Sequence, residues 1–113
     1  MAEGVYASSG ASQGNLTVSY YGVWDRWGTN GGKGLASVSW SDITGTITLT
    51  INFNDTVDQI ETTDGSVQVT WSGKTATLTF ANTVSNPLTV GIHLNHGTKI
   101  DDLQITGYSY SVA

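Results

Sequence analysis

Residues 45–53 read Gly-Thr-Ile-Thr-Leu-Thr-Ile-Asn-Phe, and this is the most regular stretch of the chain. Apolar and polar side chains alternate, which is the period of a β-strand that buries one face and leaves the other in water. We therefore expect a strand with four inward side chains, Ile47, Leu49, Ile51 and Phe53. Because the same period recurs along the chain and no segment shows a helical one, the stretch indicates an all-β protein.

The two-residue period continues on both sides of this stretch. It predicts further strands over residues 4–11, 15–21, 35–40, 66–71, 75–80, 88–95 and 103–112. Ser72-Gly73-Lys74 is typical of a hairpin turn between two of them. The inward phase of the last strand switches from odd to even positions at Gly107, which indicates a β-bulge. Residues 57–63 keep no single phase, so we expect an irregular connection there.

About eight short strands, with turns roughly every ten residues, fit a two-sheet antiparallel β-sandwich. The sandwich could be of the jelly-roll or the immunoglobulin-like type, and a closed barrel is the alternative arrangement. A chain of 113 residues is large enough for one modest core, so we expect a single domain over residues 1–113.

The composition excludes several functional classes. Four basic residues and a net charge of −5 cannot supply the basic patch that nucleic-acid binding needs. No apolar run approaches the ~20 residues that cross a bilayer, so no membrane partner is expected. The absence of cysteine excludes disulfides, thiol catalysis and cysteine-ligated zinc. Uncharged polar residues take the place of charged ones, as in many secreted β-proteins, and we expect an extracellular module cut from a longer secreted protein.

Residues 22–34 interrupt the strand period with five glycines and hold two of the four tryptophans, Trp24 and Trp27. We expect a loop that presents these indoles to a ligand, with the alternative that one of them folds back over the sandwich edge. A sugar ring stacks its apolar face on an indole and bonds its hydroxyls to carboxylates, amides and hydroxyls. Asp25 and Arg26 supply polar groups between the indoles, or form a surface ion pair.

The remaining aromatic residues divide between core and surface. Tyr20 shares the phase of Leu16, so we expect it in the core, whereas Tyr21 takes the opposite face and leads into the glycine-rich segment. Trp40 and Trp71 are in phase with inward aliphatic residues but stand at strand ends, so each is either core or rim. Tyr21 and Trp71 are therefore further candidates for ligand contact.

Polar residues near the end of the chain add two candidates. His93 and Asn95 alternate with inward side chains and should lie on an outer sheet face, where they could bond a glycan. His96 follows three positions after His93, and residues at that spacing face opposite sides of a strand, which argues against a metal pair. Asp101-Asp102 forms either a turn or one side of a structural calcium site.

No pattern of catalytic residues stands out. Glycoside hydrolysis needs two carboxylates about 5 to 10 Å apart in a cleft. The acidic residues instead fall in predicted turns or loops, with no spacing that selects a pair: Asp25, Asp42, Asp55, Asp58, Glu61 and Asp64. A nucleophile motif for Ser-His-Asp chemistry is absent, and Lys33 and Lys74 stand isolated. We expect no catalytic residues, no bound metal and no cofactor.

Three segments resemble bacterial family-2 type carbohydrate-binding modules. They are residues 27–38, where a tryptophan, a glycine turn and an alternating strand follow one another, the long strand at 45–53 and the hairpin strand at 72–80. The likeness spans about residues 15 to 97 as a pattern, and Trp27 is the residue that carries over. It implies a β-sandwich that binds cellulose, xylan or related glycans and is attached to a glycoside hydrolase.

The chain departs from those modules at two positions where further loop tryptophans are expected. Glu61-Thr62 and Thr83-Val84 stand there instead, which argues against a flat platform for crystalline cellulose. The chain is similar as well to divergent sandwich modules on plant-cell-wall enzymes of gut and cellulosome-forming bacteria, which bind soluble β-glucans or hemicelluloses.

The sequence thus predicts a non-catalytic carbohydrate-binding module for a β-linked plant cell-wall polysaccharide, such as β-glucan, xyloglucan or another hemicellulose. Such a module targets a covalently linked glycoside hydrolase or other cell-wall enzyme to its substrate. The candidate contacts are Trp24, Trp27, Tyr21, Asp25, Arg26, Trp71, His93 and Asn95. The alternative is a structural or protein-binding β-sandwich domain of a secreted or cell-surface protein.

Overall fold

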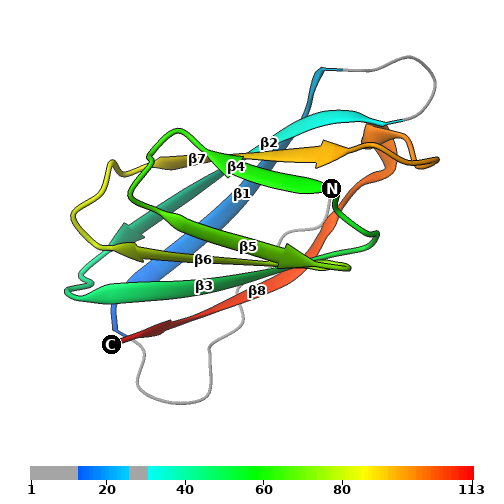
Figure 1. The fold of residues 1–113 in the computed structure, drawn as a ribbon. Coiled ribbons are helices and arrows are strands. Elements are labelled where there is room, and N and C mark those ends of the chain that lie inside the picture. The colour runs from blue at the N-terminus through cyan, green and yellow to red at the C-terminus, as the bar shows by residue number, and fades with distance from the viewer. Residues whose placement is uncertain (1–12, 26–30) are drawn as a thin grey trace.

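A computed structural model describes residues 13–25 and 31–113 as eight β-strands and one short 3-10 helix (Figure 1). The elements are β1 (Asn15–Asp25), β2 (Gly32–Ser41), β3 (Thr46–Phe53), β4 (Gln59–Thr62), β5 (Gln68–Ser72), β6 (Thr75–Ala81), β7 (Leu88–Leu94), η1 (Ile100–Asp102) and β8 (Ile105–Val112). These described ranges contain no α-helix, in agreement with the all-β prediction. Within them no helix is long and apolar enough to cross a membrane.

The strands form two four-stranded sheets that pack against each other. The first sheet has the order β1-β2-β7-β4 and the second has the order β5-β6-β3-β8, with antiparallel pairing throughout. Only β1 with β2 and β5 with β6 are neighbours both along the chain and in a sheet, and the other connections cross between the sheets. The predicted two-sheet antiparallel β-sandwich is confirmed, in place of a closed barrel. The strand predicted at residues 4–11 lies outside the described residues.

Five consecutive strands, β3 to β7, follow the order of an immunoglobulin-type sandwich. In that fold the second strand pairs with the fifth and the fifth with the fourth, while the third pairs with the sixth in the opposite sheet. Here β3 pairs with β6, β6 with β5, and β4 with β7. The outer positions are taken by β8 beside β3 and by β2 beside β7. The orders β2-β7-β4 and β8-β3-β6 also occur in the eight-stranded jelly roll, so the strand order is compatible with both sandwich types left open by the sequence.

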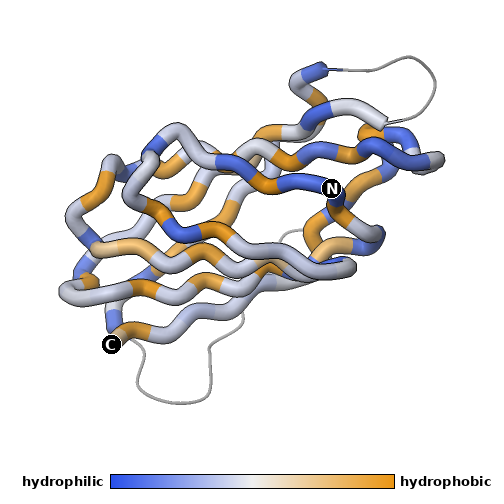
Figure 2. Tube along the Cα trace, viewed as in Figure 1, coloured by the Kyte–Doolittle hydropathy of each residue, from blue (hydrophilic) through white to orange (hydrophobic). Residues whose placement is uncertain are grey.

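Aliphatic side chains from both sheets fill the space between them. Figure 2 shows the hydrophobic positions alternating with polar ones along the strands. On β3, Ile47, Leu49 and Ile51 are at most 1% exposed, as predicted. Leu49 has Leu78 and Tyr110 as its register partners, so the inner face continues across the second sheet. Each such aliphatic side chain, when fully buried, contributes about 1.5 to 3 kcal/mol of transfer free energy.

Two aromatic residues expected inside are part of this core. Tyr20 is 3% exposed and Trp40 is 9% exposed. The Trp40 ring packs on Phe80 with a centroid separation of 5.0 Å, and its Nε1 donates a hydrogen bond to the Asn82 carbonyl. The core alternative for Trp40 is therefore the correct one.

The bulge predicted at Gly107 is present in β8. Asn52 pairs with Gly107 and the next residue, Phe53, pairs with Ile105, which leaves Thr106 as the extra residue. An extra residue changes which face the following side chains point to, and this explains the phase switch in the sequence.

Two segments differ from the sequence prediction. Residues 22–34 were expected to form a loop, but β1 continues to Asp25 and β2 begins at Gly32. Gly22 has a φ of 101°, which glycine adopts without steric cost, and the strand pairing continues through it. Residues 57–63 were expected to be irregular, but they contain β4, which pairs with β7. With only four residues, β4 is too short to show a period.

Candidate functional site

Two rows of register partners cross β2, β7 and β4 on the outer face of the first sheet. The rows are Lys33, His93 and Gln59, then Leu35, Gly91 and Glu61. Their neighbours along the strands, such as Ala36 and Ile92, are fully buried, and successive side chains of a strand face opposite sides. The side chains of the two rows therefore point away from the core, as predicted for His93.

Two bulges in β1 bring aromatic side chains to the surface beside these rows. The register between β1 and β2 slips at Tyr21 and again at Trp24, so each of these is an extra residue. The Tyr21 side chain is 71% exposed and the Trp24 side chain is 57% exposed. The Trp24 indole is therefore exposed on β1 because one extra residue is inserted there.

The start of β2 is anchored to the segment that leads into η1. The Gly31 N–H donates to the Thr98 carbonyl at 2.9 Å, and the Ile100 N–H donates to the Gly31 carbonyl at 3.2 Å. Gly32 has a φ of 129°, and a Cβ there would lie 2.5 Å from the Asp25 carbonyl oxygen and 2.7 Å from the Ile100 side chain. Only glycine fits this position, where β1 and β2 diverge.

A hollow of about 500 Å³ lies on this outer face, and we refer to it as the Trp24 hollow. It is lined by Trp24, Leu35, Glu61, Thr62, Thr63, Thr89 and Gly91. Gly91 provides the floor because it lies in the middle of β7 and has no side chain. A Cβ there would lie 3.0 Å from Glu61 Cγ and 3.3 Å from Lys33 Cε. Glycine inside a central strand commonly marks a place where another group approaches the backbone closely.

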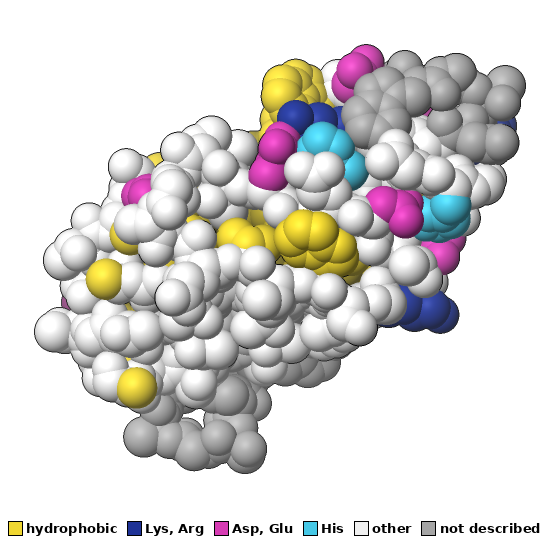
Figure 3. All heavy atoms as spheres, in the orientation of Figure 1, with side chains coloured by type: hydrophobic (Ala, Val, Ile, Leu, Met, Phe, Trp, Pro, Cys, Tyr) yellow, Lys and Arg dark blue, Asp and Glu magenta, His cyan; other side chains and the backbone are white. Residues whose placement is uncertain are grey.

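A second hollow of about 390 Å³ shares Trp24 with the first. It is lined by Trp24, Asp25, Lys33 and His93. The indole therefore borders a hollow rich in threonine on one side and a more highly charged one on the other. Figure 3 shows lysine, carboxylate and histidine side chains gathered towards the upper right of one face, next to a hydrophobic patch, while most of the remaining face is uncharged.

Glu61 contacts side chains from two other strands, β2 and β7. Its Oε1 forms an ion pair with the Lys33 ammonium and lies 3.2 Å from His93 Nε2. The same ammonium lies 4.0 Å from the centroid of the Trp24 ring, which is a cation–π contact. The hydrogen bond from Lys33, and then that from His93, hold the pKa of Glu61 below its ordinary value, so Glu61 is a carboxylate at neutral pH.

The structure brings three of the predicted contact residues together: Trp24, Asp25 and His93 all line the second hollow. Tyr21 is exposed nearby on β1 but lines neither hollow. Asn95 follows β7 in an exposed turn, where its N–H donates to the Asp58 carboxylate. Arg26 and Trp27, the latter the residue carried by the family resemblance, lie outside the described residues.

Trp71 lies at the seam between the two sheets. It pairs with the core residue Ala76, so its side chain turns inward, but β5 is an edge strand and the ring stays 41% exposed. Its Nε1 donates to the Asp58 carbonyl at 3.1 Å, which ties β5 to the segment before β4. Trp71 is therefore a rim residue that lines neither of the two hollows.

Sequence reasoning missed three residues of the site. Lys33 was expected to be isolated, but it contacts both Glu61 and Trp24. Glu61 was expected in a loop, but it lies on β4. Gly91 carried a usable signal, because an outward glycine inside an alternating strand leaves an open position on that face.

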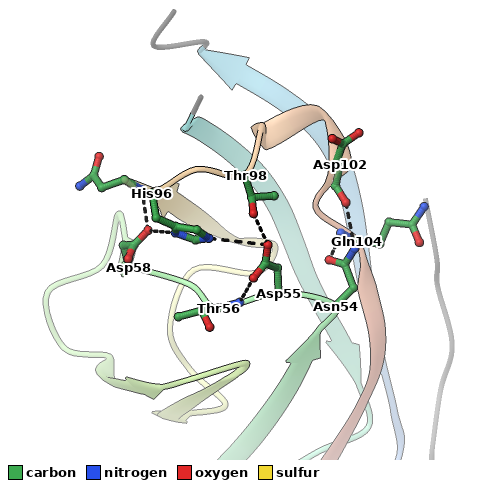
Figure 4. Close-up of polar contacts among 9 residues, drawn as sticks. Asn54, Asp55, Thr56, Asp58, His96, Thr98, Asp102 and Gln104 are labelled. Carbon is green, nitrogen blue, oxygen red and sulfur yellow. Dashed lines mark hydrogen bonds and ion pairs between the residues drawn. The ribbon is translucent and has the colours of Figure 1, made fainter. Parts of the chain in front are cut away.

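A separate polar cluster joins two loops at the end of the sandwich (Figure 4). We call it the His96 cluster, and its members are Asp55, Asp58, His96 and Thr98. His96 Nδ1 lies 2.6 Å from Asp58 Oδ2, and His96 Nε2 lies 3.6 Å from Asp55 Oδ2. Asp55 also accepts a hydrogen bond from the Thr98 hydroxyl. The segment between β3 and β4 is thereby tied to the segment that follows β7.

These contacts shift the protonation of all three titratable groups. The hydrogen bond with Asp58 raises the pKa of His96. The hydrogen bond from Thr98, ahead of that from the Thr56 N–H, lowers the pKa of Asp55. Burial acts to raise the pKa of Asp58, but the hydrogen bonds from the Asn95 N–H and from His96 outweigh it and leave the pKa lowered.

The calcium alternative at Asp101-Asp102 gains no support from the geometry. Both residues fall in η1, and Asp102 is held through its backbone carbonyl, which accepts a hydrogen bond from Asn54 Nδ2 at 2.9 Å. The described part of the chain contains no group of three or more histidine, cysteine, aspartate or glutamate residues that could hold a metal ion.

Comparison with known proteins returns no assignment: no protein-family model, no curated protein and no solved structure matches this chain.

Proposed function

We propose that this chain is a non-catalytic carbohydrate-binding module that takes a β-linked plant cell-wall glycan into the Trp24 hollow. The observation that carries the proposal is an indole, 57% exposed, beside a hollow of about 500 Å³ with a glycine floor. The apolar face of a sugar ring stacks on such an indole, and the hollow beside the indole has room for the ring. By targeting its glycan, the module would hold a covalently linked cell-wall enzyme at its substrate outside the cell.

The polar lining of the hollow supports the same proposal. A sugar ring carries hydroxyl groups around its edge, and these both donate and accept hydrogen bonds. Glu61 offers carboxylate oxygens as acceptors, while the hydroxyls of Thr62, Thr63 and Thr89 can donate or accept. Stacking on one wall and hydrogen bonding on the others is the combination that a small-ligand site uses for orientation.

Affinity electrophoresis through gels containing β-glucan, xyloglucan, mannan or pectin tests the proposal. We expect at least one of these to retard the protein, and Trp24→Ala to weaken binding about fivefold or more, since one lost ring stack costs ~1 kcal/mol. Trp71→Ala is the matched control, because it is the same truncation at an exposed tryptophan outside both hollows. If no polysaccharide retards the protein, the alternative function as a structural or protein-binding domain is favoured.

A further inference from the structure

We infer that the Trp24 hollow selects uncharged glycans, and that Glu61 sets this selection by engaging Lys33. The inference rests on the proposed function and names the chemical class of the glycan. Plant cell-wall polysaccharides are either neutral or carry uronic acids. The charge around the hollow therefore determines which of these two classes binds more tightly.

Carboxylates outnumber ammonium groups among the described residues that line the two hollows. Glu61 lines the Trp24 hollow, and Asp25 and Lys33 line the hollow on the other side of the indole. A uronate carboxylate placed over the Gly91 floor would therefore approach the Glu61 carboxylate, since a Cβ on Gly91 would lie 3.1 Å from Glu61 Oε1. Like charges at such separations repel, most strongly where the surrounding protein excludes water.

Lys33 does not offset this repulsion because its charge is already used within the protein. Its ammonium is paired with Glu61 and lies 4.0 Å from the Trp24 ring centroid. A ligand carboxylate that approached this ammonium would compete with Glu61 for it. Neutral hydroxyl groups do not need the Lys33 ammonium, because they can donate directly to the Glu61 carboxylate.

Loss of the Glu61 charge should reverse the selection. Glu61→Gln keeps the size of the side chain but releases the Lys33 ammonium, which then faces a ligand carboxylate beside the indole. In Glu61→Gln/Lys33→Met the released cation is absent, so the reversal should disappear. Asp42→Asn is the matched control for net charge, because Asp42 is exposed just beyond the far end of β2 and its φ of 59° is one that asparagine tolerates.

The test measures dissociation constants by affinity electrophoresis of the 113-residue chain on two pairs of polysaccharides that differ in charge. They are hydroxyethylcellulose against carboxymethylcellulose, and arabinoxylan against glucuronoxylan, so that both pairs have β-linked backbones. We expect the unmodified protein to bind the neutral member of at least one pair about fivefold more tightly, which corresponds to ~1 kcal/mol. We expect Glu61→Gln to tighten binding of the acidic member by a similar factor and Asp42→Asn to leave the ratio unchanged. The double variant, which lacks both the Glu61 and the Lys33 charge, should bind the two members about equally.

Equal binding of the neutral and acidic members, or an unchanged ratio in Glu61→Gln, overturns the inference while the proposed function stands. The same applies if Asp42→Asn shifts the ratio as much as Glu61→Gln, because the effect is then one of net charge. Failure of every polysaccharide, including the neutral ones, to retard the protein overturns the proposed function together with the inference.

Discussion

The His96 cluster makes the stability of the fold depend on pH in a defined direction. His96 has a raised pKa, so its contribution to stability is fully present below the ordinary value of 6.5 and is lost as the pH rises through the pKa of the folded state. Asp55 and Asp58 have lowered pKa values, so their contribution is present above 3.8 and is lost as the pH falls through the folded values. The cluster therefore stabilises the protein most between about pH 4 and pH 6.5.

The size of the effect follows from the contacts that His96→Gln removes. A hydrogen bond to a charged partner contributes about 1.5 to 3 kcal/mol, and the distance of 2.6 Å from Nδ1 to Asp58 places this one in that class. The side chains of His96 and Asp58 are 31% and 29% exposed, so solvent screening reduces the gain to about 1.5 kcal/mol. We expect His96→Gln to cost about this much at pH 5.5 and less at pH 8.5, because the contribution of the His96 charge is lost as the pH rises through its raised pKa.

Urea unfolding followed by tryptophan fluorescence at the two pH values measures this difference. At pH 5.5 the change corresponds to a fall in Tm of about 6 °C for a domain of this size. Lys99→Gln, an exposed substitution in the same loop, removes one positive charge as a control and should show no such pH dependence. A His96→Gln cost that is equal at pH 5.5 and pH 8.5 would refute the assignment of an ionised His96 between two carboxylates.

Two further predictions concern packing. A Cβ on Gly34 would lie 2.4 Å from the Tyr20 hydroxyl, which is buried without a hydrogen-bond partner among the described residues, so Gly34→Ala should cost about 2 kcal/mol of unfolding free energy. Tyr20→Phe alone should be nearly neutral and should recover at least half of that cost in the double variant, whereas additive costs in urea unfolding would contradict the contact. Trp71→Phe removes the hydrogen bond to the Asp58 carbonyl and should lower stability by about 1 kcal/mol in the same assay, while no loss of stability would show that the rim contact is not formed in solution.

The fold was largely predictable because each strand is specified by the alternation of apolar and polar residues within its own short segment. Strict alternation over residues 45–53 is enough to orient β3, and a phase switch at Gly107 is enough to predict the β8 bulge. Residues 22–25 and 32–34 were misread as loop because glycine usually ends a strand pattern. Gly22, with a φ of 101°, instead lies inside β1 between its two bulges, and Gly32, with a φ of 129°, begins β2.

The site was only partly predictable because it depends on sheet order. Trp24 and His93 were identified from residue type and from strand phase. Lys33, Glu61 and Gly91 meet only because β7 lies between β2 and β4, and no local pattern in the sequence reveals that order. An ion pair between distant strands is therefore visible only in the folded structure.

If a glycan occupies the Trp24 hollow, Gly91→Val should weaken its binding. The valine would fill the floor and push Glu61 and Lys33 outward, but it suits a β-strand and meets only flexible side chains, so the fold should be unaffected. With the polysaccharide that retards the protein, isothermal titration calorimetry should show at least about tenfold weaker binding, which corresponds to ~1.4 kcal/mol, with Tm unchanged. Gly65→Val, at an exposed glycine with open space around it, should bind like the unmodified protein. Undiminished affinity in Gly91→Val would show that the glycan binds elsewhere and would contradict the account.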